Sequence, residues 1–300
     1  MANQHPGLKD YLMLHLLIIF WGFTSILGVL SSLEAPILVI YRTGLSFSTL
    51  LIILYLQTKT LKLPVYQVGA IAAAGLLTAF HWTTFFASAQ ISNVSTCLAG
   101  MSTTALWTSL FEPLFFKKKF EWRESLLALL VSLGLVIIYR SDFSMALGLG
   151  ISLASAIACS LFSILNRNLV RSQSALFLTT WEMGFAFVGC LLALPLLQIL
   201  GISKNGLEVL PKGWDWLNIL FLAWVCTVFA YTVSVELMKK FTAFAMNLTV
   251  NLEPVYGIVL GLLIFGQKEK MQPMFYVGLL LILGGVFIYP FMNKTKQPDR

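Results

Sequence analysis

The sequence predicts an all-α integral membrane protein of ten transmembrane helices, arranged as two inverted five-helix repeats around a central cavity. Two observations support this prediction. Hydrophobic residues make up 58% and charged residues 11% of the 300 residues, whereas soluble globular chains carry about 25% charged residues. The second half of the chain also repeats the first, and an internal repeat in an apolar chain is typical of secondary transporters.

Apolar runs separated by short polar linkers account for the ten helices. Each run is long enough to cross a hydrocarbon core of about 30 Å as a helix. The runs lack the alternation of apolar and polar residues that a membrane β-barrel needs. The predicted spans are residues 11–30, 35–56, 66–88, 93–115, 124–140, 144–166, 174–199, 214–236, 242–265 and 273–292.

The internal repeat is visible at two offsets. Shifting the sequence by 150 residues places Phe115–Tyr139 on Phe265–Tyr289, with matching lysine, glycine and tyrosine residues. A shift of 140 residues places the segment 35–54 on the segment 175–194. The offset changes between the second and third spans of the repeat, where the second half carries the long linker 200–213. An insertion at this linker therefore explains both offsets.

The first repeat is expected over residues 1–143 and the second over residues 144–300, and the two form one integrated transmembrane unit. Five spans are an odd number, so the second repeat enters the membrane from the opposite side and is inverted. With the N-terminus in the cytoplasm, the cytoplasmic segments hold roughly three times as many lysines and arginines as the outer ones, as the positive-inside rule requires. We therefore expect a multi-pass protein of the plasma (inner) membrane with both termini in the cytoplasm.

Five short motifs stand out along the chain: Phe20–Thr24, Tyr41–Gly44, Leu178–Gly184, Asn251–Val255 and Gly266–Lys268. They resemble motifs of the EamA-type transporters of the drug/metabolite transporter superfamily. In the last motif the family typically has glutamate after the glycine, where this chain has glutamine. The resemblance covers about residues 10 to 290 and implies a two-fold pseudosymmetric basket of ten helices. It also implies transport of a small metabolite, often outward, without saying which metabolite.

Ionisable side chains inside the spans are the strongest candidates for a site, because a charge in the membrane needs a partner or a water-filled cavity. Arg42 and Glu182 hold equivalent positions at the offset of 140, and each follows an aromatic residue. We interpret them as a cavity-facing pair that acts in transport, as a structural ion pair, or as two residues that are each satisfied separately near a helix end. Glu112 lies late in the fourth predicted span. Its alternative role is a carboxylate that balances the lysines at 117–119.

Ring side chains suggest where the cavity lies. His81 and Trp82 are adjacent in the third predicted span, and the offset of 150 places His81 opposite Tyr231. Two hydrogen-bonding rings at related positions suit a central cavity, and a histidine that titrates near neutral pH suits a coupling proton. The alternative is a histidine hydrogen-bonded within the bundle and a tryptophan anchored at the lipid interface.

The ninth predicted span adds three polar residues to the candidate cavity. Asn247 and Asn251 are four residues apart and share one face of a continuous helix. Glu253 precedes a proline, as in the unwound segments that line transporter cavities. The alternative is hydrogen bonding between helices, worth roughly 1 kcal/mol for each bond. Trp21 and Trp107 are candidate aromatic walls of the same cavity.

The predicted function is a secondary transporter that moves a small metabolite by alternating access, with an amino acid or related compound as substrate and export as direction. The expected partners are this substrate, the lipid bilayer and a coupling proton or ion, with no nucleic acid. A nucleotide-sugar antiporter is the alternative within transport, although Arg42 is the one lysine or arginine in the interior of a predicted span. An intramembrane lipid-modifying enzyme is the alternative outside transport, but no catalytic cluster is apparent. We predict no cofactor and no metal site.

Overall fold

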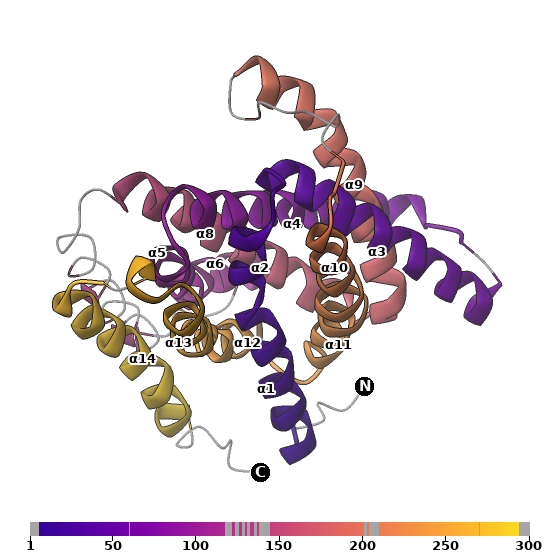
Figure 1. The fold of residues 1–300 in the computed structure, drawn as a ribbon. Coiled ribbons are helices and arrows are strands. Elements are labelled where there is room, and N and C mark those ends of the chain that lie inside the picture. Colours follow the sequence, from indigo (N-terminus) through magenta and orange to yellow (C-terminus); the bar gives the residue numbers. More distant parts are fainter. Residues whose placement is uncertain are drawn as a thin grey trace, which may run out of the picture.

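The structure is a computed structural model, and helices are the only regular elements in the part of the chain that it describes (Figure 1). That part comprises residues 6–59, 61–117, 145–200, 203, 210–269 and 271–293, with scattered positions between 122 and 137. The all-helical prediction is therefore confirmed. The helices are α1 (Leu8–Gly22), α2 (Thr24–Leu30), α3 (Ala35–Thr58), α4 (Val65–Ile91), α5 (Val94–Met101), α6 (Thr104–Phe116), α8 (Ala146–Leu169), α9 (Ala175–Ile199), α10 (Trp214–Leu220), the π-helix η3 (Phe221–Phe229), α11 (Ala230–Leu237), α12 (Ala243–Val250), α13 (Glu253–Phe265), the 3₁₀-helix η4 (Gly266–Glu269) and α14 (Pro273–Asn293).

Among the described residues, six helical segments are long and apolar enough to cross a membrane. The predicted fourth, ninth and tenth spans correspond to α5 with α6, α12 with α13, and α14. The predicted fifth span, 124–140, lies largely outside the described residues. The six segments are Leu8–Leu30, Ala35–Thr58, Val65–Ile91, Ala146–Leu169, Ala175–Ile199 and Trp214–Leu237.

Large apolar side chains cover much of the outer surface as well as the core. Leu192, Leu263 and Leu280 are largely exposed in the isolated chain. Extensive exposed apolar surface marks contact with a partner or a membrane. Together with the long apolar helices, this surface identifies a multi-pass membrane protein whose outer side chains face lipid.

Two of the helical spans are interrupted at equivalent places in the repeat. The fourth span breaks between α5 and α6 at Ser102 and Thr103, and the ninth breaks between α12 and α13 at Asn251 and Leu252. The two breaks therefore overlap at the sequence offset of 150. The halves also cross, because α5 packs on α13 and α6 packs on α12. The crossing brings both interruptions to the middle of the bundle.

Helices α3 and α9 meet in a reciprocal contact that follows the offset of 140. Both helices begin at equivalent alanines, Ala35 and Ala175. A Cβ atom at Gly44 would lie 2.9 Å from the Phe187 ring, and one at Gly184 would lie 2.8 Å from the Phe47 ring. Each phenylalanine thus fills the space that the glycine of the other repeat leaves open. This exchange indicates a local two-fold relation between the repeats.

The eighth span contains a π-helical stretch, η3, between α10 and α11. Its wider turn gives the Thr227 hydroxyl a bond to the Leu222 carbonyl, five residues earlier, at 2.8 Å. Such stretches are rare and often occur at functional sites. The stretch ends two residues before Tyr231, which lines the central cavity described below.

Helix α4 runs through the middle of the bundle, where it packs along α8 and α9. The closest approach to α9 is at Gly75, because a Cβ atom there would lie 2.5 Å from the carbonyl oxygen of Glu182. Glycine at this position therefore lets the backbone of α9 come close to α4. This approach places Glu182 beside the polar residues of α4, α8 and α11.

Candidate functional site

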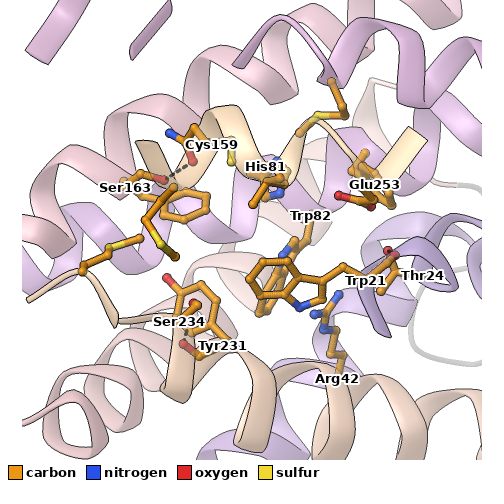
Figure 2. A pocket seen from close by; sticks show the side chains of 17 residues that line it. Trp21, Thr24, Arg42, His81, Trp82, Cys159, Ser163, Tyr231, Ser234 and Glu253 are labelled. Atoms are coloured by element: carbon orange, nitrogen blue, oxygen red, sulfur yellow. Dashed lines mark hydrogen bonds between the residues drawn. The ribbon is translucent and has the colours of Figure 1, made fainter. Parts of the chain in front are cut away.

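A cavity of about 80 Å³ lies between helices of both repeats (Figure 2). This volume exceeds the minimum of roughly 10–15 Å³ for one water molecule but is well below the roughly 300–1,000 Å³ of typical ligand pockets. The cavity is therefore contracted and admits only a small ligand group without widening. Its walls combine aromatic, sulfur-containing and polar side chains, and its lining residues are Trp21, Thr24, Arg42, His81, Trp82, Phe85, Met101, Cys159, Phe162, Ser163, Tyr231, Ser234, Met238, Met246, Asn247, Val250 and Glu253.

Arg42 supplies the positive charge at this cavity. Its Nε donates to the Thr227 hydroxyl at 2.9 Å, and its guanidinium carbon lies 3.6 Å from the centre of the Trp82 ring. A guanidinium over an aromatic face gains cation–π attraction, and more so where water is excluded. The side chain is almost fully buried. Neutral groups thus hold Arg42 in place, and its other N–H donors have no ion-pair partner among the described residues.

Trp21 forms a second wall beside Arg42. Its indole N–H donates to the carbonyl of Cys226 at 3.2 Å, and the Thr24 hydroxyl donates to the Trp21 carbonyl at 2.7 Å. Phe23 interrupts the first span next to these residues, where α1 gives way to α2. The π-helix η3 therefore anchors both neighbours, since Cys226 holds Trp21 and Thr227 holds Arg42.

Glu253 supplies a carboxyl group at the cavity, as the first residue of α13 directly after the break in the ninth span. Carboxylates are favourable at this end of a helix. In Figure 2, Glu253 and Arg42 lie toward the same end of the cavity, with Trp21 and Thr24 between them. In the described part of the chain, no ion pair joins Glu253 to Arg42. A guanidinium and a carboxyl group therefore face one small space without a direct ion pair between them.

His81 and Tyr231 both line the cavity but make different contacts. The His81 Nδ1 atom lies 2.8 Å from the Ser155 hydroxyl oxygen, and the imidazole packs on Phe162 with ring centres 5.5 Å apart. The ring of Tyr231 also packs on Phe162, at 6.1 Å, and on Trp82, at 5.8 Å. His81 and Tyr231 thus belong to one aromatic cluster around the cavity.

Asn247 connects the cavity to a group of hydroxyls. Its amide nitrogen donates to the Thr108 hydroxyl at 2.8 Å, and its amide oxygen accepts from the Ser163 hydroxyl at 3.2 Å. Thr108 lies within 3.0 Å of the Ser160 hydroxyl in turn. This network joins α6, α8 and α12 across the boundary between the repeats.

Glu182 lies outside the cavity lining but is linked to it. Its Oε2 atom accepts from the Tyr231 hydroxyl at 2.9 Å and from the amide nitrogen of Asn166 at 3.1 Å. Among the residues that the structure describes, Glu182 has no ion-pair partner. Arg42 and Glu182 therefore form neither of the predicted pairs, because each binds neutral groups instead.

Three other predicted site residues lie away from the cavity lining. Asn251 caps α12 at the helix break, and Trp107 donates to the Thr103 hydroxyl at 3.2 Å. Glu112 accepts from the backbone N–H of Phe244 at 3.1 Å and lies 3.8 Å from the guanidinium of Arg167. Residues 118 and 119 of the lysine cluster, the alternative partner of Glu112, lie outside the described residues.

Sequence reasoning missed several lining residues, chiefly Thr24, Cys159, Ser163 and Ser234. Serine, threonine and cysteine are common in membrane helices, so no spacing distinguished these from hydroxyls that bond to their own helix. No group of three or more His, Cys, Asp or Glu residues suited to a metal ion occurs within the described segments.

The fold and the site together define a class of protein. Long apolar helices form a bundle, two spans are broken at equivalent positions, and a cavity with buried ionisable residues lies inside. This is the architecture of a membrane transporter. The chain belongs to the EamA-like transporter family, whose profile matches residues 8–140 and 146–289. The resemblance inferred from the motifs is confirmed. The family assignment supports a membrane transporter.

Two further likenesses agree with this assignment. The uncharacterized transporter YetK of Bacillus subtilis (strain 168) is 28% identical over 147 residues, which are 49% of this chain and 42% of that protein. The match therefore spans less than half of the relative. A crystal structure of another protein resembles this chain with a TM-score of 0.69, over 96% of this chain and 99% of the other, at 16% identity. At this identity the likeness concerns the fold alone.

Proposed function

We propose that the protein carries a small zwitterionic metabolite of the amino-acid class out of the cell by alternating access through the central cavity. One observation supports this most directly: the Arg42 guanidinium and the Glu253 carboxyl group line the same cavity and form no ion pair with each other. A ligand that carries one negative and one positive group matches both side chains at once.

Burial explains why such a ligand would be favoured. An ionised side chain within the membrane is costly unless it is paired or solvated. An α-carboxylate at Arg42 would accept charge-assisted hydrogen bonds from the guanidinium N–H groups. An α-ammonium group would donate hydrogen bonds to Glu253. Trp82 and Trp21 would then cover the ligand's remaining surface. A ligand with only one of the two groups would leave a buried charge without a partner.

The repeat supports a route for the substrate across the membrane. The proposed units, residues 1–143 and 144–300, would be inverted, with both termini in the cytoplasm of a cell bounded by the plasma (inner) membrane. Transporters of this kind rock one repeat against the other around a fixed site. The breaks at Ser102–Thr103 and Asn251–Leu252 lie where such movement would need the helices to bend. The contracted cavity would then be an intermediate that widens toward either face.

Exchange assays in proteoliposomes test this function. We expect the purified protein to exchange neutral amino acids, using radiolabelled serine, leucine and phenylalanine as probes. Phenylpropionate, which lacks the amino group, and phenethylamine, which lacks the carboxyl group, should compete at least about tenfold more weakly than phenylalanine, since 1.4 kcal/mol separates affinities by this factor.

Matched variants assign the recognition to the two charges. Arg42→Gln and Glu253→Gln should each abolish exchange while retaining expression. The controls are Arg171→Gln and Glu236→Gln, which change residues that are exposed in the structure and should retain exchange. Preference for an anion or a cation over every zwitterion, or full activity of both cavity variants, would contradict the proposal.

A further inference from the structure

We propose that Glu182 is a proton-binding site that is coupled to the cavity through Tyr231, so that one proton is taken up and released at this carboxyl group during each transport cycle. The inference rests on the transport function proposed above. It assigns the coupling proton to a residue outside the cavity lining, whereas the sequence suggested His81.

Hydrogen-bond accounting around Glu182 is the first argument. Asn166 uses its amide nitrogen for two bonds, to Glu182 and, at 2.9 Å, to the Tyr231 hydroxyl. Tyr231 donates its own proton to Glu182, and Thr78 donates to the Ala74 carbonyl at 2.9 Å. The donors of this cluster are thus used. Two buried acceptors, Oε1 of Glu182 and Oδ1 of Asn166, remain without a partner among the described residues.

A proton on Glu182 supplies the donor that the cluster lacks. Glu182 is fully buried, at 0% exposure, and an ionised carboxylate without a cation at such a place is strongly unfavourable. As a neutral acid, the same side chain keeps the bonds to Oε2 and turns Oε1 into a donor. The neutral form therefore fits this conformation of the protein.

The charged and titratable groups on the surrounding helices do not neutralise Glu182. On α3, Arg42 is held by Thr227 and Trp82, and on α4, the His81 ring contacts Ser155. On α8, Arg167 faces Glu112. On α11, Tyr231 donates its proton to Glu182, while Glu236 pairs with Lys239. On α9 itself, the Cys190 sulfur lies 4.0 Å from the Thr83 hydroxyl. No cation thus faces the carboxyl group from these helices within the described segments.

One helical segment connects Glu182 to the ligand site. Thr227 holds Arg42, and Tyr231, four residues later on the same span, holds Glu182. Residues four apart lie on one helix face, so a displacement of this face alters both contacts together. A ligand that draws Arg42 away from Thr227 would shift the face that carries Tyr231. Glu182 would then lose its donor, contact water and release its proton.

Proton-driven accumulation tests the site separately from transport itself. Two sets of proteoliposomes are prepared. The first is loaded with amino acid and measures the exchange of radiolabelled phenylalanine. The second contains no amino acid and is given a pH gradient. We expect the wild-type protein to accumulate phenylalanine against its gradient when a pH gradient is present. Glu182→Gln should retain exchange and lose accumulation to the level of empty liposomes, because glutamine keeps the hydrogen bonds of the neutral acid but cannot release a proton.

Control variants separate this role from others. Glu236→Gln, a change at an exposed carboxylate, should keep both activities, and Tyr231→Phe should retain folding but weaken accumulation. Failure of exchange in the wild-type protein would overturn the transport function. Three outcomes would overturn the proton site alone. The Glu182→Gln variant could keep both exchange and normal accumulation, a sodium gradient could drive accumulation instead, or the wild type could show no proton-driven accumulation.

Infrared spectroscopy provides a measurement that needs no active variant. At neutral pH the wild-type protein should show the C=O band of a buried neutral carboxylic acid. This band should be missing from Glu182→Gln and present in Glu236→Gln. A band of equal intensity in Glu182→Gln would place the proton elsewhere and overturn the assignment, as would the absence of any such band in the wild type.

Discussion

The close approach of α4 and α9 makes Gly75 a sensitive position, with a built-in control on the same helix. A Cβ atom at Gly75 would lie 2.5 Å from the Glu182 carbonyl oxygen and 2.9 Å from Cβ of Phe185, whereas one at Gly69 has no neighbour within 4 Å. The contacts at Gly75 include backbone and the base of a side chain, so no rotamer change relieves them. The substitution Gly75→Ala must therefore separate the two helices.

The magnitude follows from this geometry. Ordinary contact would require the helices to part by roughly 1 Å, and a gap of this size forfeits a quarter to a half of the attraction between facing atoms. Overpacking of this kind costs about 1–3 kcal/mol. Alanine also gains about 1 kcal/mol of helix propensity over glycine, which partly offsets the cost at Gly75 and is unopposed at Gly69.

Thermal unfolding of the purified variants in detergent, followed by tryptophan fluorescence, measures the difference. One kcal/mol corresponds to about 2–4 °C in Tm for chains of 150–250 residues. We expect Gly75→Ala to unfold several degrees below the wild type, with weaker proton-driven accumulation because the bond from Tyr231 to Glu182 is displaced. Gly69→Ala should match or exceed the wild type. Equal Tm values for the two variants would refute the close approach.

Two further predictions follow from the site and the topology. Replacing Thr227 by valine leaves the Nε donor of Arg42 without its acceptor, so the free energy of unfolding should fall by about 1–3 kcal/mol. The control Thr249→Val removes only a bond to its own helix and should have a much smaller effect. Equal effects of the two substitutions would contradict this role of Thr227. An impermeant maleimide should label a single cysteine at Lys117 from the cytoplasmic side, in inverted vesicles. It should label a single cysteine at Lys212 from the outer side, in intact cells. The reverse pattern would exclude the proposed orientation.

Much of the fold could be predicted from the sequence because membrane burial and repetition leave strong patterns. Hydropathy located the helical spans, and the offset of 140 matched the helices that begin at Ala35 and Ala175. The charges at Arg42 and Glu182 were correctly expected to be buried, since lipid contact would be costly. The π-helix was not anticipated, because the residues of Phe221–Phe229 do not differ in character from the rest of the span.

The contacts within the site were harder to predict, because equivalence in a repeat does not mean proximity. Arg42 and Glu182 hold equivalent positions, but both bind residues of the eighth span, Thr227 and Tyr231, rather than each other. Asn251 was placed on one face with Asn247 by assuming a continuous helix. The helix ends at Val250, so Asn251 caps it and lies outside the cavity lining.

Thiol labelling of Cys159 tests the central claim, that substrate crosses the membrane through this cavity, most directly. Cys159 lines the cavity and is buried in the contracted state. In a protein whose other cysteines, Cys97, Cys190 and Cys226, are replaced, a small impermeant thiosulfonate should modify Cys159 from the cytoplasmic face in inverted vesicles and from the outer face in intact cells. The amino acid that exchanges fastest should slow both reactions. Modification from one face alone, or rates unaffected by substrate from either face, would contradict the account.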